Sequence, residues 1–138
     1  MAGATEEEMS MLLDRIEVIT LFVDDIDEAK AFYQKVFAPA SVYEDAVSSV
    51  LKFSATMVNL LKSTEAPRLV EPSAVAAPGS GARILLTIKV DDVDAVCAEL
   101  RRLGVTLLNG PIDRPWGRRT AAFADPSGHV WEVAQELD

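Results

Sequence analysis

The sequence is poor in the residues that build covalent cross-links and imidazole metal sites. Its 138 residues include one cysteine, Cys97, and one histidine, His129. A single cysteine cannot form an intrachain disulfide or a cysteine-rich zinc site. Cys97 falls on the apolar side of an expected helix, so we interpret it as a buried, unreactive thiol rather than a nucleophile.

Long hydrophobic runs and positive charges are also scarce. No apolar run approaches the roughly 20 residues that cross a bilayer, which excludes a membrane span. The 22 Asp and Glu residues outnumber the 13 Lys and Arg residues, and the resulting net charge of −9 would repel a phosphate backbone. We therefore expect neither a membrane nor a nucleic acid as a partner. The N-terminus is acidic where a secretory signal would be basic, so we expect a cytoplasmic protein.

What the sequence does contain is an internal repeat. The stretch Val23-Asp24-Asp25-Ile26-Asp27 returns as Val90-Asp91-Asp92-Val93-Asp94, an offset of 67 residues. In each copy an alternating apolar run ends in Val, an Asp pair follows, and helical spacing begins, which predicts a strand, a capped turn and a helix. Asp25, with Glu28 three residues later, has the spacing of a helix N-cap, so these acidic residues have a structural explanation.

The repeat divides a single domain, residues 1–138, into two units of the same element order. The first unit, 16–63, is predicted to contain a strand at 15–23, a helix ending near 37, and strands at 41–44, 47–54 and 56–62. The apolar patch at 9–13 is expected to form a turn of helix that docks on the domain. Residues 64–82 are rich in proline, glycine and small residues, which is typical of a linker, with a flap over a pocket as the alternative.

The second unit, 83–136, is predicted to repeat this order. We expect a strand at 83–90, a helix from 93 to 103 ended by Gly104, a strand at 105–108, a loop at 109–116, and strands at 118–124 and 129–135. The turn Asp125-Pro126-Ser127-Gly128 suits type I geometry, so the last two strands should form a hairpin. Trp131 is expected in the core under a helix.

The tandem β-α-β-β-β order, the Val-Asp-Asp sequence that opens each helix, and the closing sequence from Asp125 to Glu132 resemble the vicinal oxygen chelate family. That family includes glyoxalases, extradiol dioxygenases and bleomycin-resistance proteins. The resemblance covers about residues 16–136 and implies an α+β fold. In this fold each unit curls into half of a cup of mixed sheet, with the helices outside. Family members commonly form homodimers, so the resemblance also implies a homodimer.

The resemblance further implies where a metal would lie. Metal-dependent members hold a divalent ion between the halves, with ligands on the first and last strands of each unit. In this sequence those positions are Val18, Asn59, Leu85 and Glu132. Val18 and Leu85 cannot bind metal, and one carboxylate with one amide falls short of a catalytic ligand set. We expect no cofactor, and a divalent metal remains the lesser alternative.

The side chains that share a face with these four positions should form the floor of the cup. This floor is mainly apolar with a few polar groups, which is the usual composition of a small-molecule pocket. The alternative, that these residues fill the cup as core, stays open. The floor residues are Val18, Thr20, Phe22, Met57, Asn59, Leu61, Leu85, Thr87, Lys89, Val130 and Glu132.

Two residues of this region need separate interpretation. Glu132, if buried without a metal, must be paired, protonated or solvated, and Lys89 is the candidate partner. A carboxylate that holds a cationic ligand or acts as a base is the functional alternative. Trp116, between Pro115 and Gly117, offers a flat face for a ligand, although packing at a hairpin tip explains it nearly as well.

Three functions follow as hypotheses. The first is a metal-independent protein of the bleomycin-resistance type that binds a small apolar or cationic aromatic molecule in the cup. The second is a lyase, isomerase or dioxygenase that uses Glu132 with or without a divalent metal. The third is an interaction module whose exposed strands pair two chains.

Overall fold

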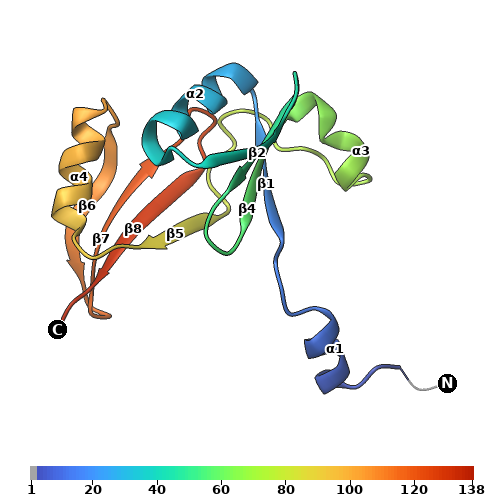
Figure 1. Cartoon of the computed structure of the whole chain (residues 1–138), viewed down its shortest axis with the longest axis horizontal. Coiled ribbons are helices and arrows are strands. Elements are labelled where there is room, and N and C mark those ends of the chain that lie inside the picture. Colours follow the sequence, from blue (N-terminus) through green and yellow to red (C-terminus); the bar gives the residue numbers. More distant parts are fainter. Residues whose placement is uncertain (1–2) are drawn as a thin grey trace.

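The computed structural model describes residues 3–138 and has two four-stranded mixed sheets with the helices outside them (Figure 1). This is the α+β architecture expected from the sequence. The elements run in the order α1 (Glu6–Leu12), β1 (Val18–Val23), α2 (Ile26–Phe37), β2 (Ala40–Glu44), β3 (Ser48–Lys52), β4 (Met57–Lys62), η1 (Ser63–Glu65), α3 (Pro67–Val70), β5 (Leu85–Lys89), α4 (Val93–Arg102), β6 (Leu107–Arg114), β7 (Arg118–Ala124) and β8 (Val130–Glu136).

The two sheets have the same topology, with orders β1-β4-β3-β2 and β5-β8-β7-β6. In each sheet the first strand pairs in parallel with the last strand of its unit, and the other pairings are antiparallel. Thr20 stands beside Asn59 in the first sheet, and Thr87 beside Glu132 in the second. The sequence repeat is therefore a repeat of strand register.

Both repeated helices begin at the aspartates that the sequence indicated. The Asp25 side chain accepts a hydrogen bond from the backbone N–H of Glu28 at 3.0 Å, and the Asp92 side chain accepts one from that of Ala95 at 3.1 Å. Such N-caps each stabilise a helix by about 1 kcal/mol. Capping thus accounts for one aspartate of each Asp pair.

The hydrophobic core is shared by the two units. Leu21 and Tyr33 of the first unit belong to one buried cluster with Cys97, Phe123 and Trp131 of the second. Trp131 is 4% exposed and packs against Tyr33 of α2, which confirms its predicted place in the core. Cys97 is fully buried, and burial raises the pKa of its thiol, as expected for an unreactive cysteine.

A buried polar network also joins the units. The Tyr33 hydroxyl donates to Asp125 Oδ2 at 2.6 Å and accepts a hydrogen bond from Trp131 Nε1 at 2.9 Å. His129 Nδ1 lies 2.8 Å from the same carboxylate oxygen, and the backbone N–H groups of Ser127 and His129 donate to Asp125 Oδ1. The closing turn of the chain is therefore tied to the first helix of the repeat.

This network shifts the pKa values of its two acidic groups in opposite directions. Burial, followed by the charge of Asp125, raises the pKa of Tyr33 well above its ordinary value. Burial also acts to raise the pKa of Asp125, but the hydrogen bonds from His129 and Tyr33 outweigh it. The net pKa of Asp125 lies below its usual value. Both shifts favour a neutral Tyr33 beside an ionised Asp125.

Two local predictions were wrong. Residues 9–12 do lie in a helix, but α1 has no buried residue and lies apart from the body at the end of an extended segment (Figure 1). The expected loop at 109–116 is largely strand β6, whose pairing with β7 shifts register on both sides of Asn109. The sequence Asn109-Gly110-Pro111 suggested a loop, but the register shifts accommodate it within the strand.

The segment 64–82 begins inside η1 and contains the single turn α3. Further along, residues 75–82 approach the body and form part of a cleft described below. Among residues 3–138, no helix has the length and apolar character needed to cross a membrane.

Candidate functional site

The residues expected to form the cup floor lie on the sheet faces opposite the shared core. We call these surfaces the cup faces. On the first sheet Val18, Phe22, Met57 and Asn59 are half-buried and Thr20 is exposed, whereas the alternating residues Leu21 and Val23 are core. The strand alternation therefore places these side chains as the sequence predicted.

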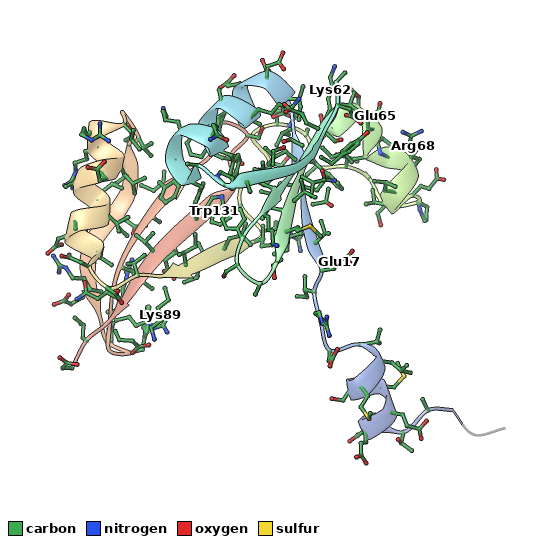
Figure 2. The ribbon with its side chains drawn as sticks, viewed as in Figure 1. Glu17, Lys62, Glu65, Arg68, Lys89 and Trp131 are labelled. Carbon is green, nitrogen blue, oxygen red and sulfur yellow. The ribbon has the colours of Figure 1, made fainter. Side chains whose placement is uncertain are left out.

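The cup face of the second sheet is more open. Leu85 is 50% exposed, Thr87 and Lys89 are exposed, and Glu132 is half-buried. Figure 2 shows Lys89 on the side of β5 away from helix α4. A cup filled as core is therefore not what this sheet shows.

The four family metal positions do not form a ligand set for a divalent ion. Val18 and Leu85 have no donor atom, and the Oδ1 atom of Asn59 is buried without a hydrogen-bond partner. Within residues 3–138 no group of three or more His, Cys, Asp or Glu side chains is placed to hold a metal. Glu132 alone cannot supply the several oxygen or imidazole ligands that a dication needs.

Glu132 has a different partner from the one expected. The Thr87 hydroxyl donates to Glu132 Oε1 at 3.0 Å, because Thr87 is its direct neighbour across the parallel strand pair. Lys89 stands beside Ala134 instead, and it makes no ion pair with Glu132 in the described part of the chain. The predicted Lys89–Glu132 pair is wrong, and Glu132 is oriented by a neutral hydroxyl.

Three further polar residues lie on the cup face of the second sheet, and the sequence did not single them out. Arg114 donates from Nε to Thr120 Oγ1 at 2.9 Å and from Nη2 to Asn109 Oδ1 at 3.3 Å. Thr120 stands beside Ala134 of β8. Asn109 stands beside Ala122, which in turn stands beside Glu132, so these side chains lie on the same face of the sheet as Glu132. Alternation from Glu132 would have found Asn109 and Arg114 had 109–114 been recognised as strand, and Thr120 could have been found on the predicted strand at 118–124.

Trp116 lies in the turn between β6 and β7 and is 67% exposed. The guanidinium carbon of Arg114 lies 5.9 Å from the centre of its ring, which is within the range of a cation–π contact. The turn thus places one aromatic face at the edge of this part of the cup face.

A cleft of about 530 Å³ lies between the units. It is lined by residues of β1, among them Thr20 and Phe22, by residues 75–84, and by the end of the β7–β8 turn with Val130. Of the predicted site residues it therefore brings together Thr20, Phe22 and Val130, but neither Asn59 nor Glu132. The segment 75–82, interpreted from the sequence as linker, supplies one of its walls.

The comparisons with known proteins agree with this architecture. The profile of the glyoxalase/bleomycin resistance protein/dioxygenase superfamily matches residues 15–133. The chain belongs to this superfamily. The match includes residues of both units and the four family metal positions, Val18, Asn59, Leu85 and Glu132.

Individual proteins resemble the chain along most of its length. The virulence protein STM3117 of Salmonella typhimurium is 27% identical over 132 residues, which cover 94% of this chain and 89% of that protein. A superfamily protein from Nocardioides has a TM-score of 0.80 at 20% identity, covering 89% of this chain and 83% of that one, and shows the fold alone. TnmS3, an antibiotic binding protein from Streptomyces, has a TM-score of 0.67 at 29% identity over 88% of this chain and 95% of that one.

Proposed function

We propose that this member of the superfamily binds a small apolar or cationic aromatic molecule on its cup faces without a metal. The proposal is carried by two features found together: an open surface with both apolar and polar side chains, and an incomplete set of metal ligands. The surface keeps apolar side chains and one oriented carboxylate, whereas two of the four metal positions are aliphatic. The description of TnmS3 as an antibiotic binding protein supports binding as a function on this fold.

The chemistry of the cup faces supports this ligand class. Phe22, Met57 and Leu85 supply apolar area, which favours burial of an uncharged ring system. Glu132, oriented by Thr87, would attract a cationic group on the ligand, and the net charge of −9 would raise the local concentration of cations. A ligand with an aromatic body and one positive charge satisfies both features.

The test is a binding titration with naphthylmethylamine, a cationic aromatic probe, on protein treated with chelator. We expect saturable binding that the chelator leaves unchanged and that Glu132→Gln weakens by about tenfold, because a charge-assisted contact is lost. Glu99→Gln is the matched control, since Glu99 is an exposed acid on helix α4. Binding that needs added metal, or that responds equally to both substitutions, would overturn the proposal.

An enzyme that uses Glu132 as a base is the second candidate. The hydrogen bond from the Thr87 hydroxyl to Oε1 favours it, because a general base must be held in a fixed position. Metal analysis of protein purified without chelator, together with Glu132→Ala, separates the versions of this candidate. Bound stoichiometric metal would restore a metal-assisted enzyme, and its absence leaves only the version in which Glu132 acts alone.

We also propose that two copies of the chain pair as a homodimer. In support, every residue of the outer strand β2 is exposed, and its Val42 and Tyr43 side chains are each 55% exposed. Strand β2 pairs with β3 on one side only, and an edge strand with apolar side chains is a template for pairing with another chain. Light scattering on the purified protein tests this proposal, and a strict monomer at high concentration would contradict it.

A further inference from the structure

Arg114, the last residue of β6, presents its side chain on the same face of the second sheet as Glu132. It pairs with Arg118 of β7, which in turn pairs with Glu136 of β8, and Glu136 shares a face with Glu132 by two-residue alternation. Arg119, the next residue along β7, reaches the other way and contacts Asp94 of helix α4 at 2.9 Å. Arg114 therefore belongs to the open cup face and not to the helix-covered face.

Neutral groups hold the guanidinium of Arg114 in place. Its Nε donates to Thr120, which is only 1% exposed, and its Nη2 donates to Asn109. The ring of Trp116 lies 5.9 Å from the guanidinium carbon. These contacts fix the orientation of the side chain but leave its positive charge uncompensated.

The absence of a carboxylate partner sets Arg114 apart from its neighbours. Arg118 is paired with Glu136 at 2.7 Å, and Arg119 with both Asp94 and Asp113 at 2.9 Å. Arg114 makes no ion pair within residues 3–138, and its direct cross-strand neighbour is another arginine. Like charges opposite one another destabilise a strand pair. In a chain of net charge −9, a guanidinium that is held in place without an acidic partner on the cup face suggests that it binds an anionic ligand.

We infer that Arg114 is the anion-binding residue of the cup face and that it receives the carboxylate of a small aromatic ligand. The Nη1 atom makes no hydrogen bond in the described chain, so this side of the guanidinium is available to a carboxylate. Trp116 provides an exposed flat surface beside it for an aromatic ring.

The inference rests on the proposed function for the location of the ligand and adds a second charge to it. Asn109, Ala122 and Glu132 are neighbours across three adjacent strands. Two strand spacings separate the Asn109 and Glu132 backbones by roughly 10 Å. The ligand class is therefore an aromatic molecule with a carboxylate at one end, and a cationic group at the other end would meet Glu132.

The test is a titration of isotope-labelled protein with naphthoate, followed by NMR at the arginine Nε–H and backbone amide resonances. Naphthylmethanol is the uncharged probe of similar size. We expect naphthoate to shift the Arg114 Nε–H resonance to saturation and to bind about tenfold more tightly than naphthylmethanol. Arg114→Gln should remove this preference, and Arg102→Gln, which removes a charge from helix α4 on the opposite face, should leave it intact.

Arg114→Lys is the second variant, because it keeps the charge near Thr120 and Trp116 but lacks the planar fork. Arg114→Lys should weaken naphthoate binding several-fold. This variant keeps the inference testable if Arg114→Gln does not fold. Equal affinities for naphthoate and naphthylmethanol, or unchanged naphthoate affinity in a folded Arg114 variant, would overturn the inference. If naphthylmethylamine shifts the cup-face amides and naphthoate does not, the inference fails while the proposed function stands. If no probe shifts these amides, both fail.

Discussion

The buried contact between Tyr33 and Asp125 gives the sharpest prediction about stability. Replacing Tyr33 by Phe keeps the aromatic ring in the core but removes one hydroxyl, which both donates to Asp125 and accepts from Trp131. Tyr33 is fully buried, so water cannot replace the hydroxyl without entering the core. The substitution therefore isolates the polar link between the two units from their apolar packing.

The magnitude follows from what each partner loses. The indole N–H of Trp131 is left without an acceptor, and an unsatisfied buried donor costs about 1–3 kcal/mol. Asp125 loses one hydrogen bond but keeps those from Ser127 and His129. Because the two losses share one atom, they do not add fully, and we expect the free energy of unfolding to fall by about 2–4 kcal/mol.

Equilibrium urea unfolding measures this loss, and Tyr43→Phe is the matched control. The Tyr43 hydroxyl also donates to a carboxylate, that of Asp45 at 2.9 Å, but the residue is 55% exposed. Water can replace this contact, so the control should unfold close to the natural protein. Equal losses for the two variants would refute the reasoning that burial makes the Tyr33 network important.

The raised pKa of Tyr33 adds a dependence on alkaline pH. Above pH ~10 the tyrosine ionises in the unfolded chain but stays protonated in the folded one, so the unfolded state binds fewer protons and stability falls as pH rises. Tyr33→Phe removes this proton difference. Its stability should therefore fall less steeply than that of the natural protein between pH ~10 and pH ~11, by up to about 1.4 kcal/mol per pH unit. Parallel curves for the two proteins would contradict the assignment.

Three further predictions concern acid, a glycine and the N-terminus. The pKa of Asp125 is lowered in the folded protein, so the ionised carboxylate stabilises the fold above pH ~4, and this stabilisation is lost as pH falls through the lower folded pKa. In urea unfolding, Asp125→Asn should therefore lose less unfolding free energy in acid than the natural protein does. Gly110 and Gly117 share a φ of 87°, but a Cβ at Gly110 would lie 2.4 Å from the Thr120 carbonyl oxygen whereas Gly117 has open space. Gly110→Ala should therefore lower the melting temperature much more than Gly117→Ala, and equal shifts would contradict this packing argument. Removal of residues up to 14 takes away helix α1, which buries nothing, so the unfolding free energy should change by less than ~1 kcal/mol, and a larger loss would mean that the helix docks after all.

The repeat explains why so much of the fold could be predicted from the sequence. Val23-Asp24-Asp25 and Val90-Asp91-Asp92 each end a strand and cap a helix, and these are local events that depend on a few adjacent residues. Period-two alternation then placed Val18, Thr20 and Phe22 together on the floor of the cup. In the structure these side chains are half-buried or exposed, whereas the alternating residues Leu21 and Val23 are core.

The errors lie where tertiary contacts override local sequence. Asn109-Gly110-Pro111 is typical of a loop, yet it forms part of strand β6 because the segment pairs with β7 in the folded sheet. This misassignment concealed Arg114 and its contacts with Thr120 and Asn109. The Lys89–Glu132 pair was wrong because the register of β5 and β8 places Thr87, and not Lys89, directly beside Glu132.

The most direct test of metal-independent binding on the cup faces is an amide chemical-shift map of chelator-treated protein titrated with naphthylmethylamine. Metal-independent binding predicts saturable shifts centred on Thr87 and Glu132, with little change along helix α4, and the same map after zinc is added. Shifts that occur only with zinc, or that centre on α4, would contradict it.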